Sequence, residues 1–166
     1  MHFKKLIILL LFIPINSFSQ LLSLSDLIQL RNATFNETQK CFAYKKFTLE
    51  YKVSSADSTK EIVSFRSTDK IFQSVRLVYD STCEKCIFLT LLCEFDQFRL
   101  LKDEIEARHF DNISNHVKLT DADVFTKKLY VYQGREFIFE FKIFGAPPET
   151  NMFSVTICDI SDYKKL

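Results

Sequence analysis

The chain has 166 residues and a formal net charge of +1, with 22 Lys and Arg against 21 Asp and Glu. This near-neutral charge, without a basic stripe, argues against a nucleic-acid partner, since phosphate backbones are bound by clustered cations. Only two glycines are present, Gly134 and Gly145. Glycine-rich phosphate loops, dinucleotide fingerprints and the Gly-x-Ser-x-Gly elbow of hydrolases are therefore excluded.

The N-terminus has the pattern of a cleaved export signal. An apolar run at residues 6–13 follows two lysines, Pro14 ends that run, and small residues then stand at the spacing that signal peptidase reads. We expect residues 1–19 to be a signal peptide, cleaved before Gln20, and the protein to be periplasmic or extracellular. The apolar run is about ten residues, whereas a membrane span needs roughly twenty, so no span is expected after cleavage.

Helical spacing opens the mature chain, residues 20–166, which we expect to be one α+β domain of about 147 residues. Ser25 can cap a first short helix, and a Thr-x-x-Glu capping box at residues 34–37 begins a second. A third and stronger helix is expected from Asp96, as its N-cap, to Phe110. Its inner face carries Phe98, Leu101 and Ile105.

Period-two alternation predicts antiparallel strands between and after these helices. The expected strands are Lys46–Val53, Glu61–Arg66, Ile71–Tyr79, Cys86–Phe95, Leu129–Tyr132, Arg135–Phe144 and Met152–Ile160. In the first strand, Phe47, Leu49, Tyr51 and Val53 are expected to share one face. In strand 135–144, one face carries Phe137, Phe139, Phe141 and Ile143. The predicted fold is an antiparallel sheet with helices packed on one face.

Two half-repeats, residues 21–95 and 96–160, are suggested by the order of the elements. Each opens with helix and closes with strands, as in degenerate αα-ββββ-like repeats, although the second half is one strand short. Laying residues 78–93 over residues 143–158 puts Cys93 opposite Cys158.

Two resemblances follow from these patterns. The leader, with Ser-Phe-Ser before Gln20, resembles signal peptides of Bacteroidetes-type bacteria, and the order of helices and strands is similar to small uncharacterised exported proteins of that group. The tandem of helices and antiparallel strands also looks like the architecture of the β-lactamase-inhibitor-protein type, in which one face of the sheet is presented to a protein. Both resemblances imply binding and no known reaction.

Five cysteines are present, and two of them form Cys83-Glu84-Lys85-Cys86. Catalytic C-x-x-C motifs open a helix, whereas a strand is expected after Cys86. We therefore expect a small Cys83–Cys86 disulfide that pins a turn, with Cys41–Cys158 as a possible second bridge. The alternative is a thiol-redox or metal-binding protein that uses Cys83 and Cys86.

No metal and no cofactor are expected from the remaining side chains. His109 and His116 lie near several aspartates, Asp111, Asp121 and Asp123, but their spacing matches neither a zinc helix nor a calcium loop. We expect them to be solvated side chains at a helix end and in a loop.

Two Asp-Ser-Thr turns contain candidate O-glycosylation sites at Ser58 and Ser81, because they resemble the sites that Bacteroidetes modify on exported proteins. Ordinary turn chemistry is the other interpretation, since Asp and Ser both bond to nearby backbone.

The function expected from the sequence is non-enzymatic binding of a protein or envelope component. The open face of the sheet is predicted to carry Arg76, Tyr130, Tyr132, Glu140 and Lys142. Aromatic residues beside charged ones are enriched at protein interfaces. A hydrolase of envelope polymers is a third and more distant hypothesis, because no catalytic motif supports it.

Overall fold

A computed structural model describes residues 21–69, 71–82, 84–117, 125–146 and 150–163. The helices are α2 (Leu24–Asn32), α3 (Phe35–Tyr44) and α4 (Phe95–Ala107), with short 3-10 turns η1 (Ser114–His116) and η3 (Ile160–Asp162). The strands are β1 (Phe47–Ser54), β2 (Lys60–Ser67), β3 (Gln73–Asp80), β4 (Cys86–Cys93), β5 (Asp111–Asn112), β6 (Thr126–Gln133), β7 (Phe137–Ala146) and β8 (Thr150–Asp159). The α+β prediction is confirmed.

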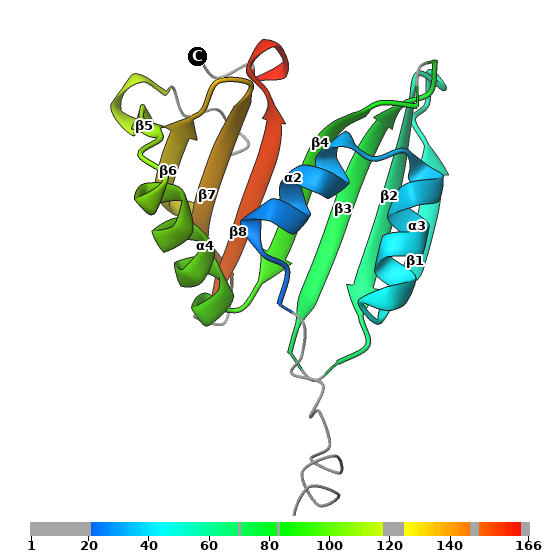
Figure 1. Ribbon diagram of the computed structural model, residues 1–166, viewed down its shortest axis with the longest axis horizontal. Coiled ribbons are helices and arrows are strands. Elements are labelled where there is room, and N and C mark those ends of the chain that lie inside the picture. Colours follow the sequence, from blue (N-terminus) through cyan, green and yellow to red (C-terminus); the bar gives the residue numbers. More distant parts are fainter. Residues whose placement is uncertain (1–20, 70, 83, 118–124, 147–149, 164–166) are drawn as a thin grey trace, which may run out of the picture.

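All eight strands form one antiparallel sheet in the order β1-β2-β3-β4-β8-β7-β6-β5. Two meanders of four strands meet at the centre, where β4 pairs with β8 (Figure 1). The second half is therefore not one strand short, because the two-residue β5 completes it by pairing with β6. Such a short strand gives no period-two signal in a sequence.

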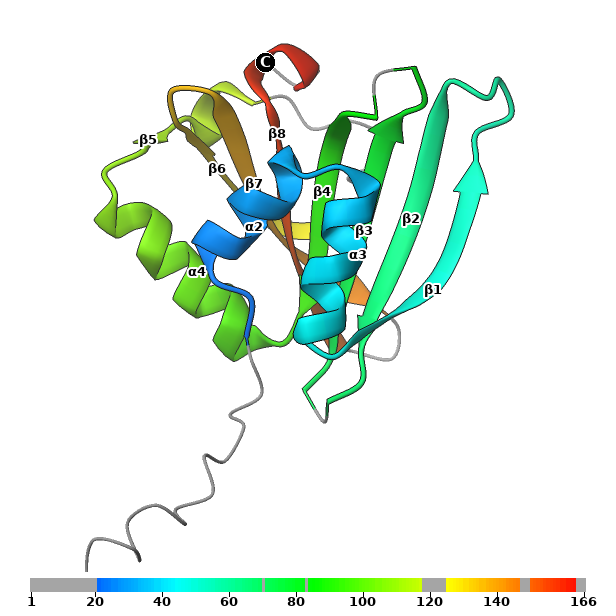
Figure 2. The same ribbon diagram turned by 45° about the vertical axis from the view of Figure 1, so that its right-hand side comes forward.

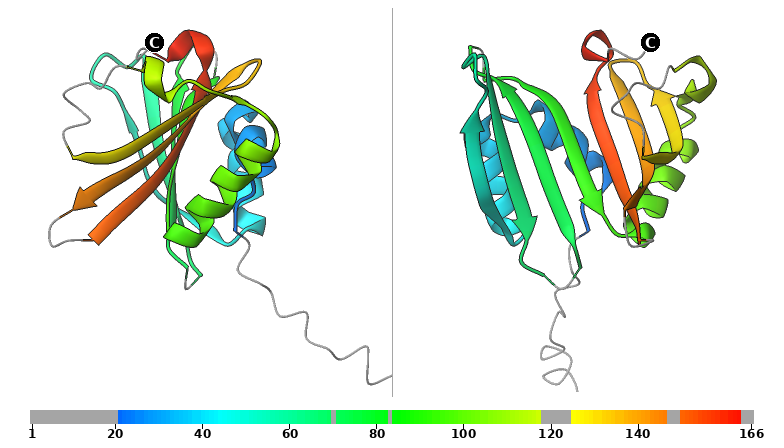
Figure 3. Two further views of the ribbon diagram at one scale, coloured as in Figure 1. Left: turned by 90° about the vertical axis from the view of Figure 1, so that its left-hand side faces the viewer. Right: turned by 180° about the vertical axis from the view of Figure 1, so that it is seen from behind.

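The three helices lie on one face of the sheet and leave the other face without a helix (Figures 2 and 3). Between helices and sheet lies the main core, which includes Leu27 of α2, Phe98 and Ile105 of α4, and Phe139 and Phe141 of β7. The expected inner face of α4 is confirmed, as is the expected aromatic face of β7. Because strand side chains alternate, these assignments also fix which residues face away from the helices.

Helix starts agree with the sequence only in part. The capping box of α3 is formed, with Thr34 and Glu37 bonded reciprocally. In α2 the cap is Ser23 rather than Ser25, because Asp26 completes a second capping box with it. In α4 the N-cap is Glu94, whose carboxylate instead accepts the backbone N–H of Phe72 at 3.2 Å. A cap can therefore lie up to two residues before the most obvious candidate.

Strand β1 changes face at a bulge. Leu49 pairs with Phe65 and faces the helices, but Tyr51 pairs with Ser64, so one extra residue, Glu50, is inserted. A bulge shifts the alternation by one residue. Tyr51 and Val53 therefore lie on the helix-free side, and the expectation that they share the face of Phe47 and Leu49 is wrong.

The overlay of the two half-repeats is out of register. Cys93 lies in the main core under the helices, whereas Cys158 lies in a second, smaller cluster on the opposite face with Val131 and Ile138. Equivalent residues of a true repeat would face the same side of the sheet. The alignment that pairs Cys93 with Cys158 therefore does not describe the relation between the halves.

Candidate functional site

Two rows of mostly polar side chains cross the helix-free face of the sheet. Residues that pair directly across antiparallel strands lie side by side on one face. From β2 to β7, one row is Ser64, Arg76, Thr90, Thr156 and Glu140. The next row is Arg66, Ser74, Leu92, Ser154 and Lys142. This face points toward the viewer in the right-hand view of Figure 3.

A hollow of about 320 Å³ lies in the middle of these rows. Its small hydroxyl residues are Ser74, Thr90, Ser154 and Thr156. The larger side chains that line it are Arg76, Lys142, Leu92 and Phe144. Short side chains on the central strands β4 and β8, flanked by long ones, leave space above the sheet. The hydroxyls of Thr90 and Thr156 are hydrogen-bonded at 3.1 Å, which fixes their place in the hollow.

The two rows contain three cations and one carboxylate, and a second carboxylate, that of Glu50 in the β1 bulge, lies beside them. Arg66 Nε lies 2.6 Å from Glu50 Oε1, and Lys142 Nζ lies 2.8 Å from Glu140 Oε1. Glu140 is buried, and the hydroxyl of Tyr163 donates to its Oε2 at 2.8 Å. The negative charge of Glu140 therefore lies between the ammonium group of Lys142 and the hydroxyl donor of Tyr163.

An apolar row runs beside the polar ones. It consists of Val53, Ile62, Val78 and Phe88, and it continues into Cys158 and Ile138. The last two are buried, but Val53 is 48% exposed at the edge of the sheet. The helix-free face therefore combines an apolar strip with a polar, charged hollow.

The structure brings together three of the five residues expected on the open face: Arg76, Glu140 and Lys142. The other two lie on the helix side, because Tyr130 pairs with Phe141 and Tyr132 with Phe139, both in the main core.

Both tyrosines contact α4. The Tyr132 hydroxyl donates to Glu106 at 2.6 Å, and Lys102 lies over the Tyr130 ring at 4.8 Å. Burial, with Glu106 adding to it, raises the pKa of Tyr132 to about 12. The expectation that Tyr130 and Tyr132 belong to the binding face is therefore wrong, because the register of β6 against β7 puts them under the helix.

Cys41, Cys86, Cys93 and Cys158 are free thiols in the structure, and Cys83 lies outside the described residues. The Cys41–Cys158 bridge that the sequence left open is not formed, because Cys41 packs against the main core whereas Cys158 lies on the other side of the sheet.

Cys86 is not joined to another residue either. Its side chain is 1% exposed in the main core beside Tyr79, which differs from the expected turn-pinning Cys83–Cys86 disulfide. Burial raises the pKa of Cys86 to about 12, and it raises those of Cys93 and Cys158 to the same value.

The histidines do not converge with other ligands. His109 and His116 are both exposed, and in the described part of the chain no three His, Cys, Asp or Glu side chains come together. Asp121 and Asp123 lie outside the described residues.

The Asp-Ser-Thr turns lie side by side at one end of the sheet, because the Ser81 N–H donates to the Thr59 carbonyl at 2.9 Å. In each turn the aspartate, Asp57 or Asp80, accepts bonds from the threonine. These bonds, after one from Ser55, lower the pKa of Asp57 to about 2. Ser58 and Ser81 are both exposed, and their O-glycosylation stays a prediction.

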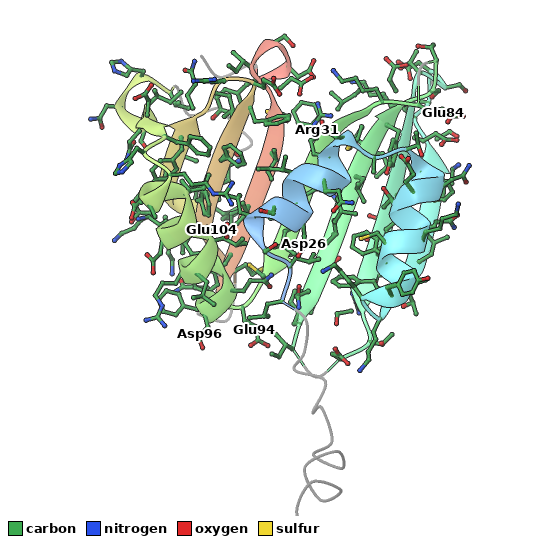
Figure 4. The ribbon with its side chains drawn as sticks, in the orientation of Figure 1. Asp26, Arg31, Glu84, Glu94, Asp96 and Glu104 are labelled. Atoms are coloured by element: carbon green, nitrogen blue, oxygen red, sulfur yellow. The ribbon has the colours of Figure 1, made fainter. Side chains whose placement is uncertain are left out.

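Sequence reasoning missed Arg31, which is fully buried. In Figure 4 it lies at the C-terminal end of α2, beside the end of β8. Its Nη2 lies 2.8 Å from Asp159 Oδ1 and 3.9 Å from Asp162 Oδ2, while Nε and Nη1 have no hydrogen-bond partner in the described structure. From sequence alone, an arginine in a short amphipathic helix is expected to be exposed, so no sequence signal predicts that Arg31 is buried.

The fold defines an α+β protein whose single antiparallel sheet is covered by helices on one face only. Comparisons with protein-family models, curated proteins and solved structures find no match for this chain. The resemblances drawn from sequence pattern therefore stay expectations. None of the described helices is long and apolar enough to span a membrane.

Proposed function

We propose that this chain is an exported, non-enzymatic binding protein and that a protein partner docks on the helix-free face of its sheet. Export rests on the leader pattern at residues 1–19. Docking rests on the helix-free face, because its combination of apolar strip, charged side chains and hollow is the mixture found in non-obligate protein interfaces. A partner that fits the hollow would exclude water from the charged rows and strengthen their interactions.

The observation that carries this proposal is the apolar row from Val53 to Phe88 beside the hollow. The apolar side chains of this row, Val53, Ile62, Val78 and Phe88, are exposed or half-buried. On the opposite face of the same sheet, apolar side chains are buried under the helices. Exposed apolar side chains rimmed by polar ones are typical of interaction sites.

The thiol-redox alternative is less well supported. A catalytic thiol needs a lowered pKa and access to solvent, whereas Cys86 is buried and its pKa is raised. The hydrolase hypothesis lacks a pair of carboxylates at the hollow, since none of the described residues that line it is Asp or Glu.

Filling the hollow tests the proposal. Thr90→Phe places a ring over the small residues of β4, and phenylalanine is well tolerated in strands. The bait would be the immobilised protein, with captured proteins from the producing cells identified by mass spectrometry. We expect at least one protein to be captured by the wild type and lost with Thr90→Phe.

The matched control is Leu100→Phe on α4, where Leu100 is 54% exposed on the helix side. It adds the same ring to the opposite side of the molecule. The proposal is overturned if every captured protein persists with Thr90→Phe, or if the same proteins are lost equally with Leu100→Phe.

A further inference from the structure

We infer that the segment of the partner that enters the hollow carries a carboxylate, placed on Arg76, next to an apolar side chain. This inference rests on the proposed function and specifies its partner: an acidic segment of a protein, rather than a phosphate or a neutral surface.

The charge balance of the helix-free face is the first argument. Arg66 and Lys142 each have a carboxylate on the same face, at 2.6 Å and 2.8 Å. Arg76 is exposed at the hollow, and no ion pair or side-chain hydrogen bond joins its guanidinium to another described residue. Among the three cations of the two polar rows, Arg76 is thus the one without a described carboxylate partner.

The surroundings of Arg76 leave room for an incoming group. Its cross-strand neighbours are Ser64 and Thr90, both short. A guanidinium binds a carboxylate through two parallel N–H bonds, and this geometry needs open space in its plane. The Thr90 hydroxyl is positioned by Thr156 at 3.1 Å and lies within the same hollow.

A single negative charge fits better than a phosphate. Glu140 is buried in the same row, with only Thr90 and Thr156 between it and Arg76. A dianion would meet one uncompensated cation, because Lys142, the other cation at the hollow, is already paired with Glu140.

The apolar wall completes the argument for a protein segment. Leu92 and Phe144 line the hollow together with its polar residues. Within the lining of the hollow, these two residues offer a contact for an aliphatic or aromatic side chain beside the acidic one. A free small anion has nothing to place there, whereas a peptide with an acidic and an apolar neighbour fills both parts.

Peptide titration tests the inference. Amide NMR spectra of the isotope-labelled protein would be followed on addition of Ac-Asp-Phe-NH2, Ac-Asn-Phe-NH2 or inorganic phosphate. We expect the Asp dipeptide to shift amides of β3, β4 and β8, and to bind about tenfold more tightly than the Asn dipeptide, since charge-assisted bonds are about twice as strong as neutral ones. Arg76→Gln should remove this preference, and Arg99→Gln, on the helix side, should retain it.

The outcomes separate this inference from the proposed function. If both dipeptides bind the hollow equally and Arg76→Gln changes nothing, the carboxylate inference is overturned while the docking face stands. If phosphate binds more tightly than the Asp dipeptide, the choice of a protein carboxylate is overturned. Shifts confined to the helix side, or no shifts with any probe, also overturn it, and the Thr90→Phe capture then decides the proposed function.

Discussion

The guanidinium of Arg31 and the carboxylate of Asp159 lie 2.8 Å apart and join the first described helix to the last strand. The two charges differ in their surroundings, because Arg31 is fully buried and its partner is 21% exposed at the side chain. Asp159 also pairs with Lys85, whereas Arg31 has Asp162 as its other carboxylate at 3.9 Å.

This asymmetry predicts unequal effects of the two truncations. Asp159→Ala leaves a buried cation with one distant partner, and we expect it to lower the free energy of unfolding by about 3–5 kcal/mol. Arg31→Met removes the buried charge itself and should cost less, since Lys85 still pairs with Asp159. Urea unfolding of both variants measures this, with Asp96→Ala at the exposed Arg99–Asp96 pair as the control, expected at about 0–1 kcal/mol. A larger loss in Arg31→Met than in Asp159→Ala would contradict it.

The buried thiols predict a loss of stability in alkali. Cys86, Cys93 and Cys158 have pKa values near 12, raised from 9.0 by burial. At pH values between the ordinary and the raised pKa, the unfolded chain releases thiol protons that the folded chain retains. The free energy of unfolding therefore falls by about 1.4 kcal/mol per pH unit for each thiol.

Urea unfolding between about pH 8 and about pH 11 measures that slope. Cys93→Ala should reduce it by one thiol's share, and Cys41→Ala should change it less because Cys41 is only partly buried. Equal slopes in the wild type and Cys93→Ala would show that Cys93 does not contribute.

Alkylation should discriminate among the thiols of the described chain. Cys41 is half-buried on α3, whereas Cys86, Cys93 and Cys158 are at most 5% exposed. We expect iodoacetamide to modify Cys41 first and the other three only when the protein unfolds, because only an accessible thiolate reacts. Peptide mass mapping against time checks the order, and rapid modification of Cys86 in the native protein would instead favour the redox hypothesis.

Tyr132 should matter for stability and not for docking. Tyr132→Phe loses the bond to Glu106 and should cost about 1 kcal/mol, whereas Tyr132→Ser also opens a cavity and should cost about 3–5 kcal/mol. Tyr44→Phe, at an 88% exposed tyrosine, is the control and should be nearly neutral. Capture of a partner should be unchanged in Tyr132→Phe, and its loss would return this residue to the binding site.

Periodicity within single elements was predictable from the sequence, as the core face of strand β7 and the inner face of helix α4 demonstrate. Relations between strands were not. Tyr130 and Tyr132 are misplaced because their face depends on the turn register, and Tyr51 is misplaced because of the inserted Glu50. The helix-free face was half predictable: Arg76, Glu140 and Lys142 were named, whereas short residues such as Thr90 carry no signal until neighbouring strands are aligned.

The central β4–β8 pair has a consequence for the order in which the molecule can assemble. Phe88 of β4 pairs with Cys158 of β8, so the two meanders can join into one sheet only after all of the intervening chain has been synthesised. The first meander is built from local hairpins, which form quickly. Until β8 arrives, however, the outer edge of β4 remains an open template for pairing with other chains. The edge of β4, which ends up in the middle of the finished sheet, is thus a place where the incompletely synthesised protein is prone to aggregate.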